Sequence, residues 1–321
     1  KAFEMIEIAK KTGLDAIKFQ TFKASEFIAN SDETYTYKSQ GKEITESMYD
    51  MFTRYEFSNK DWIKIKKKCD QEEILFLSSP QNYSDLELLL TLDIKAIKIG
   101  SDDLTNLPLL KKFAKNNLPI ILSTGMSIMD EIFDALDAVG FFSGYPTILL
   151  VTTSQYPTPT KDVNLMKFHT LSKKFPNLPL GFSDHTVGPL ASSLACVLGA
   201  TFFEKHFTLD HNLPGPDHSF SVDPQELKIW RDSIINSFEM LGNPNIKPTK
   251  EEEKMKIIAR RSICAIQDIK KGEIFTPKNL GIRRPGNGLK PIEIEKIFGR
   301  KAVKNIINGR VLEKGDYENG F

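Results

Sequence analysis

The chain has 321 residues, of which 40% are hydrophobic and 26% charged, and its formal net charge is +1. This length suffices for one large and one small domain, each with its own core. The near balance of acidic and basic residues argues against nucleic acid as the main partner. No apolar run approaches membrane-spanning length, the first residues show no signal peptide core, and the three cysteines are scattered. We therefore expect a reduced, cytoplasmic protein without a membrane partner.

Short β-rich runs alternate with amphipathic helical runs over the first 241 residues. Helices are expected at residues 2–11, 62–69, 107–114 and 129–138. Strands are expected at residues 16–21, 75–79, 96–101, 120–125, 148–154, 180–183 and 201–206. An alternation of this kind predicts a parallel sheet with right-handed crossovers.

Polar residues follow all seven predicted strands at their carboxyl ends. A doubly wound sheet concentrates such residues near its switch point, whereas a closed barrel distributes them around one mouth. The pattern therefore predicts a TIM (β/α)8 barrel over residues 1–241. Because a closed barrel needs eight strands, we expect the natural chain to have roughly 10 to 20 further residues before residue 1, which carry the missing first strand.

Three further stretches differ from this alternation. Residues 30–58 are polar and aromatic, and we expect them to form a long loop over the barrel mouth. Residues 242–257 are rich in turn formers and charge, which is typical of a linker. Residues 258–321 are expected to form a small, mainly β domain with turns at 270–272 and 308–309.

Two lysines lie within apolar predicted strands. Period-two alternation places Lys18 and Gln20 on the face that points into the barrel mouth, and Lys98 repeats this arrangement. A buried lysine is costly unless it is paired, so two at one mouth predict a bound anion such as phosphate. The alternative is that each lysine pairs with a nearby carboxylate such as Glu204. Strand-end hydroxyls would complete the anion site: Ser79, Ser123 and Ser183.

Two histidines, His185 and His206, end neighbouring predicted strands, and each has a carboxylate close by in the sequence. Imidazoles that share one barrel mouth predict a divalent ion with nitrogen and oxygen ligands, which suits manganese or zinc. The flanking carboxylates, Asp184 and Glu204, could supply oxygen ligands or could instead fix the tautomers of the imidazoles. The alternative is that both are structural histidines in the core.

A pair of carboxylates and a cationic turn complete the candidate residues. Asp102 and Asp103 follow a predicted strand and could supply a general base, or could simply cap a helix. Arg283 and Arg284 precede a Pro-Gly turn in the small domain. A guanidinium presented by a rigid turn suits a carboxylate or sugar hydroxyls, although arginine in such a place is usually solvated.

Taken together, these residues lie in short motifs whose order resembles that of the sialic acid synthase family, the phosphoenolpyruvate-dependent synthases of nine-carbon nonulosonic acids. The resemblance spans nearly the whole chain, and the order of the motifs is more specific than any one of them. The motifs are Lys18-Phe19-Gln20-Thr21, Lys98-Ile99-Gly100-Ser101, Leu122-Ser123-Thr124-Gly125-Met126, Tyr156-Pro157-Thr158-Pro159, Ser183-Asp184-His185-Thr186, Glu204-Lys205-His206-Phe207-Thr208, Pro214-Gly215-Pro216-Asp217 and Arg284-Pro285-Gly286-Asn287-Gly288.

This resemblance implies a TIM barrel followed by an antifreeze-like (SAF) domain, in a domain-swapped homodimer whose small domains cover the partner's active site. It implies a transferase that condenses phosphoenolpyruvate with an N-acetylmannosamine-like sugar and releases phosphate. A divalent metal, expected to be Mn²⁺, would polarise the sugar aldehyde.

The resemblance also assigns roles to residues by their position. His185 and His206 match the metal ligands, Asp103 matches the proposed catalytic carboxylate, and Arg284 matches a sugar contact made from the other protomer. Gln20, Tyr156 and Asp217 match further sugar contacts. The phosphoenolpyruvate-binding set comprises Lys18, Ser79, Lys98, Ser123, Ser154 and Ser183, and the motif residue Ser101 joins the substrate-binding residues.

The chain departs from the family pattern in three places. The family's first strand, with its Asn-His-x-Gly motif, is absent, Val151 replaces a common histidine, and Ser154 stands where some members have asparagine. Three other functions stay open: a synthase of a shorter 3-deoxy-ulosonic acid, a pyruvate aldolase with Lys98 as its Schiff base, and a non-catalytic carbohydrate-binding protein.

Overall fold

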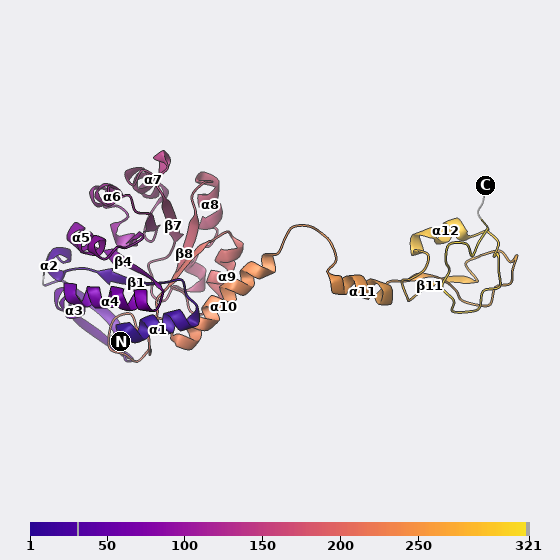
Figure 1. Cartoon of the computed structure of the whole chain (residues 1–321), viewed down its shortest axis with the longest axis horizontal. Coiled ribbons are helices and arrows are strands. Elements are labelled where there is room, and N and C mark those ends of the chain that lie inside the picture. Colours follow the sequence, from indigo (N-terminus) through magenta and orange to yellow (C-terminus); the bar gives the residue numbers. More distant parts are fainter. Residues whose placement is uncertain (31, 319–321) are drawn as a thin grey trace. The chain divides into compact units, whose positions relative to one another are not determined.

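The computed structural model describes residues 1–30 and 32–318. The chain divides into two compact units, Lys1–Gly242 and Asn243–Phe321, which are described separately below (Figure 1). None of the described helices combines the length and the apolar character that crossing a bilayer requires.

Seven parallel strands form the centre of the first unit. They are β1 (Ala16–Thr21), β4 (Leu75–Pro80), β5 (Ile97–Ile99), β6 (Ile120–Ser123), β7 (Thr147–Val151), β8 (Leu180–Asp184) and β9 (Phe202–Lys205). β1 pairs with β4, β5 to β9 pair in chain order, and β4 lies against β5. All seven strands were predicted, and several end earlier than predicted because the polar residues at the mouth leave the ladder.

The sheet is strongly curled. The ammonium group of Lys18 in β1 lies 3.0 Å from a carboxylate oxygen of Glu204 in β9, although β1 and β9 are the outermost of the seven strands. In a flat sheet, six spacings of about 4.8 Å would separate these strands by about 29 Å. The sheet therefore curves around a common mouth, and the predicted fold of TIM-barrel type is confirmed.

Helices cover the outer face of this curved sheet (Figure 1). They are α1 (Ala2–Thr12), α4 (Asn59–Gln71), α5 (Tyr83–Thr91), α6 (Leu107–Ala114), α7 (Met129–Ala138), α8 (Lys167–Lys174), α9 (Leu190–Val197) and α10 (Pro224–Leu241). Between sheet and helices, Phe19 packs against Trp62 and Phe76. Inside the barrel, a Cβ at Gly181 would lie 2.6 Å from the carbonyl oxygen of Phe202, so only glycine fits there.

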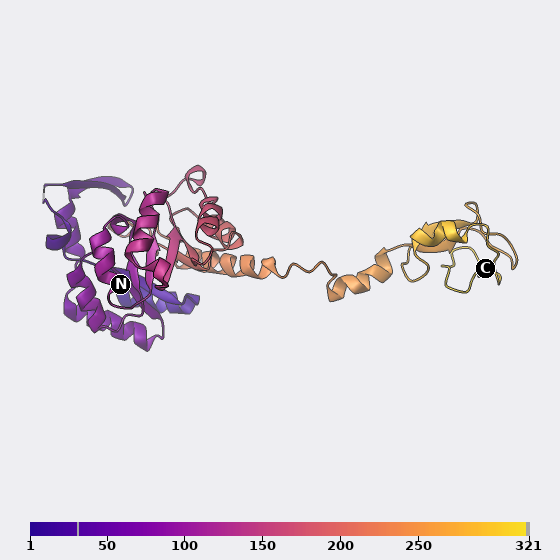
Figure 2. The same cartoon turned by 90° about the horizontal axis from the view of Figure 1, so that it is seen from above.

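The prediction of a loop over residues 30–58 was wrong. β2 (Thr34–Ser39) and β3 (Lys42–Ser47) form an antiparallel hairpin, flanked by helices α2 (Ala24–Phe27) and α3 (Met48–Tyr55), and residue 31 lies outside the described residues. Gln40 and Gly41 adopt φ values of 52° and 74°, as a two-residue hairpin turn requires. The hairpin stands out from the helices in Figure 2. Its Ser39 hydroxyl accepts a hydrogen bond of 3.1 Å from the backbone amide of Gly215, so it borders a loop of the mouth.

The second unit has its own small core. It contains α11 (Lys250–Ala259), the antiparallel strands β10 (Ser262–Ala265) and β11 (Leu280–Arg283), and α12 (Ile294–Ile297). Helix α11 occupies the second half of the stretch expected to be a linker. Its start is a capping box, in which Thr249 and Glu252 bond each other's backbone amides, and the Thr-x-x-Glu signal was present in the sequence. Apolar side chains fill the core of this unit: Ile263, Phe275, Leu280, Leu289, Ile297 and Leu312.

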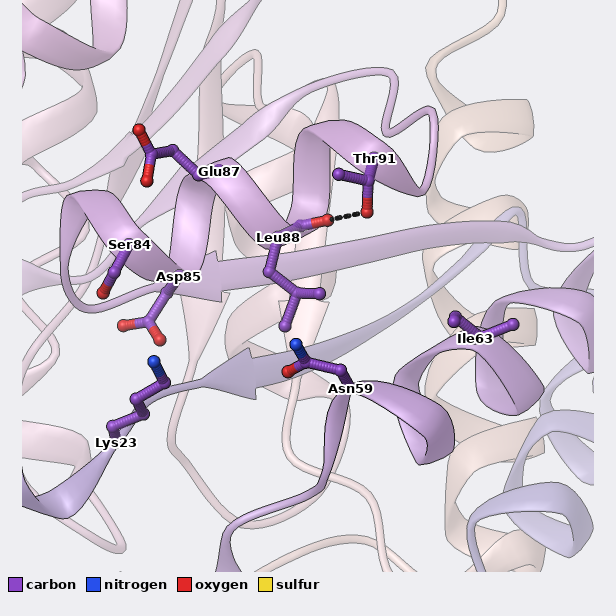
Figure 3. A pocket seen from close by; sticks show the side chains of 8 residues that line it. All are labelled: Lys23, Asn59, Ile63, Ser84, Asp85, Glu87, Leu88 and Thr91. Atoms are coloured by element: carbon purple, nitrogen blue, oxygen red, sulfur yellow. Dashed lines mark hydrogen bonds between the residues drawn. The ribbon is translucent and has the colours of Figure 1, made fainter.

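A pocket of 410 Å³ lies on the outside of the barrel, between α4 and α5 (Figure 3). No predicted site residue lines it. Its one buried charged group is Asp85, which accepts a hydrogen bond of 2.9 Å from the backbone amide of Asn82 and so caps α5. Figure 3 shows Lys23 pointing toward this carboxyl group. Burial raises the pKa of Asp85 to about 6. The pocket therefore has a structural acid rather than a catalytic one.

The raised pKa of Asp85 predicts a stability that depends on pH. The folded chain holds the proton more tightly than the unfolded chain, so this stabilisation is present at pH 4 and is lost as the pH rises through 6. Asp85→Asn keeps a hydrogen-bond acceptor for the helix cap but has no charge. It should therefore reduce the change in the free energy of unfolding between pH 4 and pH 7 by about 2 kcal/mol. Urea unfolding at pH 4 to 7 measures this, with Asp134→Asn on an exposed face of α7 as control. Parallel curves for wild type and Asp85→Asn would show that the carboxyl does not titrate in this range.

Candidate active site

Strand alternation in β8 and β9 points four polar side chains into the mouth. Ser183 and His185 come from β8 and its end, and Glu204 and His206 from β9 and its end. The Ser183 hydroxyl donates a hydrogen bond of 2.8 Å to Glu204 and lies 3.4 Å from Nε2 of His185. The centroids of the two imidazole rings are 5.3 Å apart. The structure thus brings both predicted metal ligands to one place, beside a predicted anion ligand.

Both imidazoles are neutral. Nδ1 of His185 lies 2.8 Å from the backbone carbonyl oxygen of Thr153, which can only accept, so Nδ1 carries the proton and Nε2 has a free lone pair. Burial lowers the pKa of His185, and burial together with His185 and Lys18 lowers the pKa of His206 to about 3. Neutral imidazole is the form that binds metal ions.

The expected role of Asp184 was wrong. Its carboxylate does not orient an imidazole, because alternation points it away from the mouth toward α9 and α10. There it lies 3.1 Å from Nζ of Lys205, which alternation also points outward, and both side chains are almost fully buried. Hydroxyls of Thr186 and Ser192 and the indole of Trp230 donate to the same carboxylate. The residues next to the two histidines therefore join β8 to β9 from behind, and the sequence analysis missed Lys205.

Both predicted lysines lie beside Glu204. Nζ of Lys18 is 3.0 Å and Nζ of Lys98 is 3.9 Å from its carboxylate oxygens. These contacts agree with the alternative prediction, in which each lysine pairs with a nearby carboxylate such as Glu204. Lys98 also donates to the Ser123 hydroxyl at 2.7 Å and to the Ile99 carbonyl oxygen at 2.9 Å. Burial lowers the pKa of Lys98 to about 8, with Lys18 acting in the same direction and Glu204 opposing. Burial alone would raise the pKa of Glu204, but the two lysines hold it below its ordinary value.

Two further predicted serines meet at the carboxyl ends of β5 to β7. The backbone amide of Gly125 donates a hydrogen bond of 2.9 Å to the Ser101 hydroxyl. A Cβ at Gly125 would lie 2.7 Å from that oxygen and 2.2 Å from the Ser154 hydroxyl oxygen, so both hydroxyls crowd this glycine. Ser79 is buried and is the register partner of Gln20, whose side chain is exposed at the end of β1.

Tyr156 forms one wall of the mouth. Its ring centroid lies 4.3 Å from that of His185 and 5.1 Å from that of Phe220, a neighbour that the sequence analysis missed. Burial raises the pKa of Tyr156 to about 12, so the phenol keeps its proton at neutral pH. Asp217 lies beside His206, with 3.7 Å between a carboxylate oxygen and Nδ1.

The remaining candidates are less tightly placed. Asp103 accepts a hydrogen bond of 2.9 Å from the side-chain amide of Asn106, and burial raises its pKa. Its neighbour Asp102 lies in the same short helical turn, Ser101–Asp103, which directly follows β5. Arg284 lies in the second unit, in an exposed segment after β11.

One other cluster of potential metal ligands exists among the described residues. His211, Asp223 and Glu226 lie together at the start of α10. Asp223 is the N-cap of this helix and Glu226 completes the capping box, so both carboxylates already serve a structural purpose. The cluster therefore gives no reason to move the candidate site from the barrel mouth.

A barrel mouth with paired lysines, serine hydroxyls and two neutral histidines is typical of a (β/α)-barrel enzyme that acts on an anionic substrate. Residues 5–246 match the NeuB family and residues 260–318 match the SAF domain. The chain belongs to the NeuB family and is a synthase-type transferase, as the resemblance implied.

Several relatives support this assignment. An N,N'-diacetyllegionaminic acid synthase of Campylobacter jejuni is 41% identical over 95% of this chain and 91% of its own length. A pseudaminic acid synthase of the same species is 34% identical over 99% of this chain and 92% of its own. The crystal structure of an N-acetylneuraminic acid (sialic acid) synthetase from Leptospira borgpetersenii matches with a TM-score of 0.70 and 30% identity, over 79% of this chain and 84% of that one.

The buried pair behind the histidines yields a stability prediction. Asp184→Ala leaves Lys205 buried without a counter-ion and should lower the free energy of unfolding by about 3 to 5 kcal/mol. Adding Lys205→Met should restore part of the loss, because the uncompensated charge is then gone while the buried donors around position 184 still lack their acceptor. Urea unfolding measures both variants, with Lys254→Ala, whose ion pair with Glu251 is exposed, as a control expected to be neutral. If Asp184→Ala left the free energy of unfolding unchanged, the ion pair would contribute nothing to the stability of the fold.

Proposed function

We propose that this enzyme condenses phosphoenolpyruvate with an open-chain, N-acetylmannosamine-like sugar to give a nine-carbon nonulosonic acid and phosphate. The observation that carries the proposal is the close grouping of Lys18, Lys98 and the Ser183 hydroxyl beside two neutral histidines. Such a grouping suits a phosphate ester and an aldehyde held next to each other. Family membership adds support, because relatives are named as synthases of legionaminic and pseudaminic acids.

The residues at the mouth fit a divalent metal ion, and we propose Mn²⁺. His185 has its Nδ1 proton committed to the Thr153 carbonyl oxygen, which leaves Nε2 available as a ligand. His206 is neutral as well, because burial lowers its pKa. A metal ion held by these two residues would supply Lewis-acid polarisation of the sugar aldehyde.

The chain's own residues would position the two substrates. Lys18 and Lys98, with the hydroxyls of Ser123 and Ser183, would hold the phosphate group, so that C3 of phosphoenolpyruvate faces the aldehyde carbon. Bond formation between these carbons leaves positive charge at C2. Asp103 would orient the water that adds at C2 and would take one of its protons, and this proton ends on the aldehyde oxygen, which becomes a hydroxyl. Cleavage of the C2–O bond to the phosphate then forms the C2 ketone, the C2 hydroxyl gives its proton to the departing phosphate, and the lysines stabilise the phosphate as it leaves.

This mechanism predicts a metal-dependent release of phosphate. The full-length protein should release phosphate from phosphoenolpyruvate with Mn²⁺ and one sugar from a panel of N-acetylmannosamine, its 6-phosphate and diacetamido sugars. A chelator should abolish release, and His185→Ala should lower it more than about 100-fold. A colorimetric phosphate assay measures this, with Lys254→Ala, which removes an exposed ion pair of the second unit, as a folded control.

Two outcomes would contradict the proposal. One is full activity of His185→Ala after chelation and dialysis. The other is trapping of pyruvate on the protein by borohydride, because the buried Lys98, whose pKa lies at about 8, would then act as a Schiff-base nucleophile.

We also propose a domain-swapped homodimer, in which Arg284 contacts the sugar in the partner's barrel. Arg284 is exposed and lies next to a proline in the second unit, so its guanidinium is available to a ligand outside that unit. The arrangement implies that each active site combines a barrel from one protomer with a small domain from the other.

Subunit mixing tests this arrangement. Arg284→Ala and His185→Ala homodimers should both be nearly inactive. In a heterodimer, one site combines both lesions and the other has neither, so the isolated heterodimer should have about half of wild-type activity. Purification through two different tags isolates the heterodimer for the phosphate assay. If each small domain serves its own barrel, the mixture stays as inactive as its parents.

A further inference from the structure

Glu204 lies at the centre of the candidate anion site. Its carboxylate contacts Lys18 at 3.0 Å, lies 3.9 Å from Lys98, and accepts a hydrogen bond of 2.8 Å from Ser183. These are three of the groups that would have to hold a phosphate. Its side chain is only 14% exposed, so these contacts are shielded from water.

A carboxylate in this place is unfavourable for binding an anion. Two ammonium groups and one carboxylate leave a single net positive charge for a phosphate dianion. The same donors also cannot serve both groups, because the Ser183 hydroxyl has one proton and that proton is given to Glu204. A site selected only for tight phosphate binding would have a neutral or cationic side chain here.

We propose that Glu204 takes the place of phosphate when the site is empty and gives up its lysine and serine contacts when phosphate binds. In the empty site it compensates the mutual repulsion between the half-buried Lys18 and the buried Lys98, which would otherwise face each other without a counter-ion. After the reaction, the carboxylate competes for the same donors and so favours departure of the phosphate product. This inference rests on the proposed function where it concerns that product, and on the observed contacts where it concerns the anion site.

Binding of inorganic phosphate to the full-length protein tests the inference without any turnover. Glu204→Gln has the same shape but no charge, and should bind phosphate about tenfold more tightly than wild type, because the competitor is gone. Isothermal titration calorimetry, without sugar or metal, measures the affinity. Asp134→Asn is the control: it removes an exposed carboxylate on the outer helix α7, away from the mouth, and should change the affinity less than about threefold.

A second variant guards against misfolding of the first. Glu204→Asp keeps the charge but is one methylene shorter, so it should reach the lysines less well and bind phosphate with an affinity between those of wild type and Glu204→Gln. In steady-state kinetics, Glu204→Gln should lower KM for phosphoenolpyruvate and strengthen inhibition by phosphate, while kcat falls. A residue that only supports the fold would raise KM instead.

The outcomes separate this inference from the proposed function. Tighter phosphate binding by Glu204→Gln, with no turnover of any sugar, would support the inference and contradict the proposed function. Turnover with Mn²⁺ and a sugar, together with unchanged or weaker phosphate binding by both Glu204 variants, would overturn the inference and leave the proposed function intact.

Discussion

The ion pair between Lys18 and Glu204 connects the two outer strands of the sheet across the mouth. A pair of charges can approach to 3.0 Å only if β1 and β9 have been brought together by the curvature of the strands between them. The same curvature brings Lys98 and the two histidines toward one point. The site thus depends on a contact between two residues that lie near opposite ends of the barrel sequence. It can therefore form only when the barrel itself has folded.

Because side chains alternate along β8 and β9, each strand has one face at the mouth and one face against the outer helices. The inward residues Ser183, His185, Glu204 and His206 carry the candidate chemistry, whereas the outward residues between them pack against α9 and α10. On that outer side a buried ion pair has hydrogen-bond donors around its carboxylate, from Ser192, Trp230 and the Thr186 hydroxyl and amide. Buried charges of this kind are costly to separate, so the strand ends that present the histidines are held rigidly from behind.

Much of the fold could be predicted because its signals are local. The helices predicted at 107–114 and 129–138 coincide with α6 (Leu107–Ala114) and α7 (Met129–Ala138), since apolar periodicity is a property of neighbouring residues. The β2–β3 hairpin was missed because most of its side chains are exposed and only Tyr37 and Ser39, on one face of β2, are buried, so the sequence shows little apolar alternation. The outward direction of Asp184 could have been predicted, because period-two alternation from Ser183 excludes it from the mouth. The central position of Glu204 between the two lysines could not have been predicted, because it depends on how closely β1 approaches β9.

The charge cluster at the mouth and the buried ion pair on the outer side differ in one respect that bears on function. On the outer side, one lysine meets one carboxylate, and the carboxylate has a full set of donors. At the mouth, two lysines share one carboxylate, and Lys98 completes its contacts with a hydroxyl and a backbone carbonyl oxygen. Stability alone would favour either a balanced cluster or an apolar one. An unbalanced, positive cluster therefore indicates a site that is completed by an anion from outside the chain, which is what a phosphate-bearing substrate supplies.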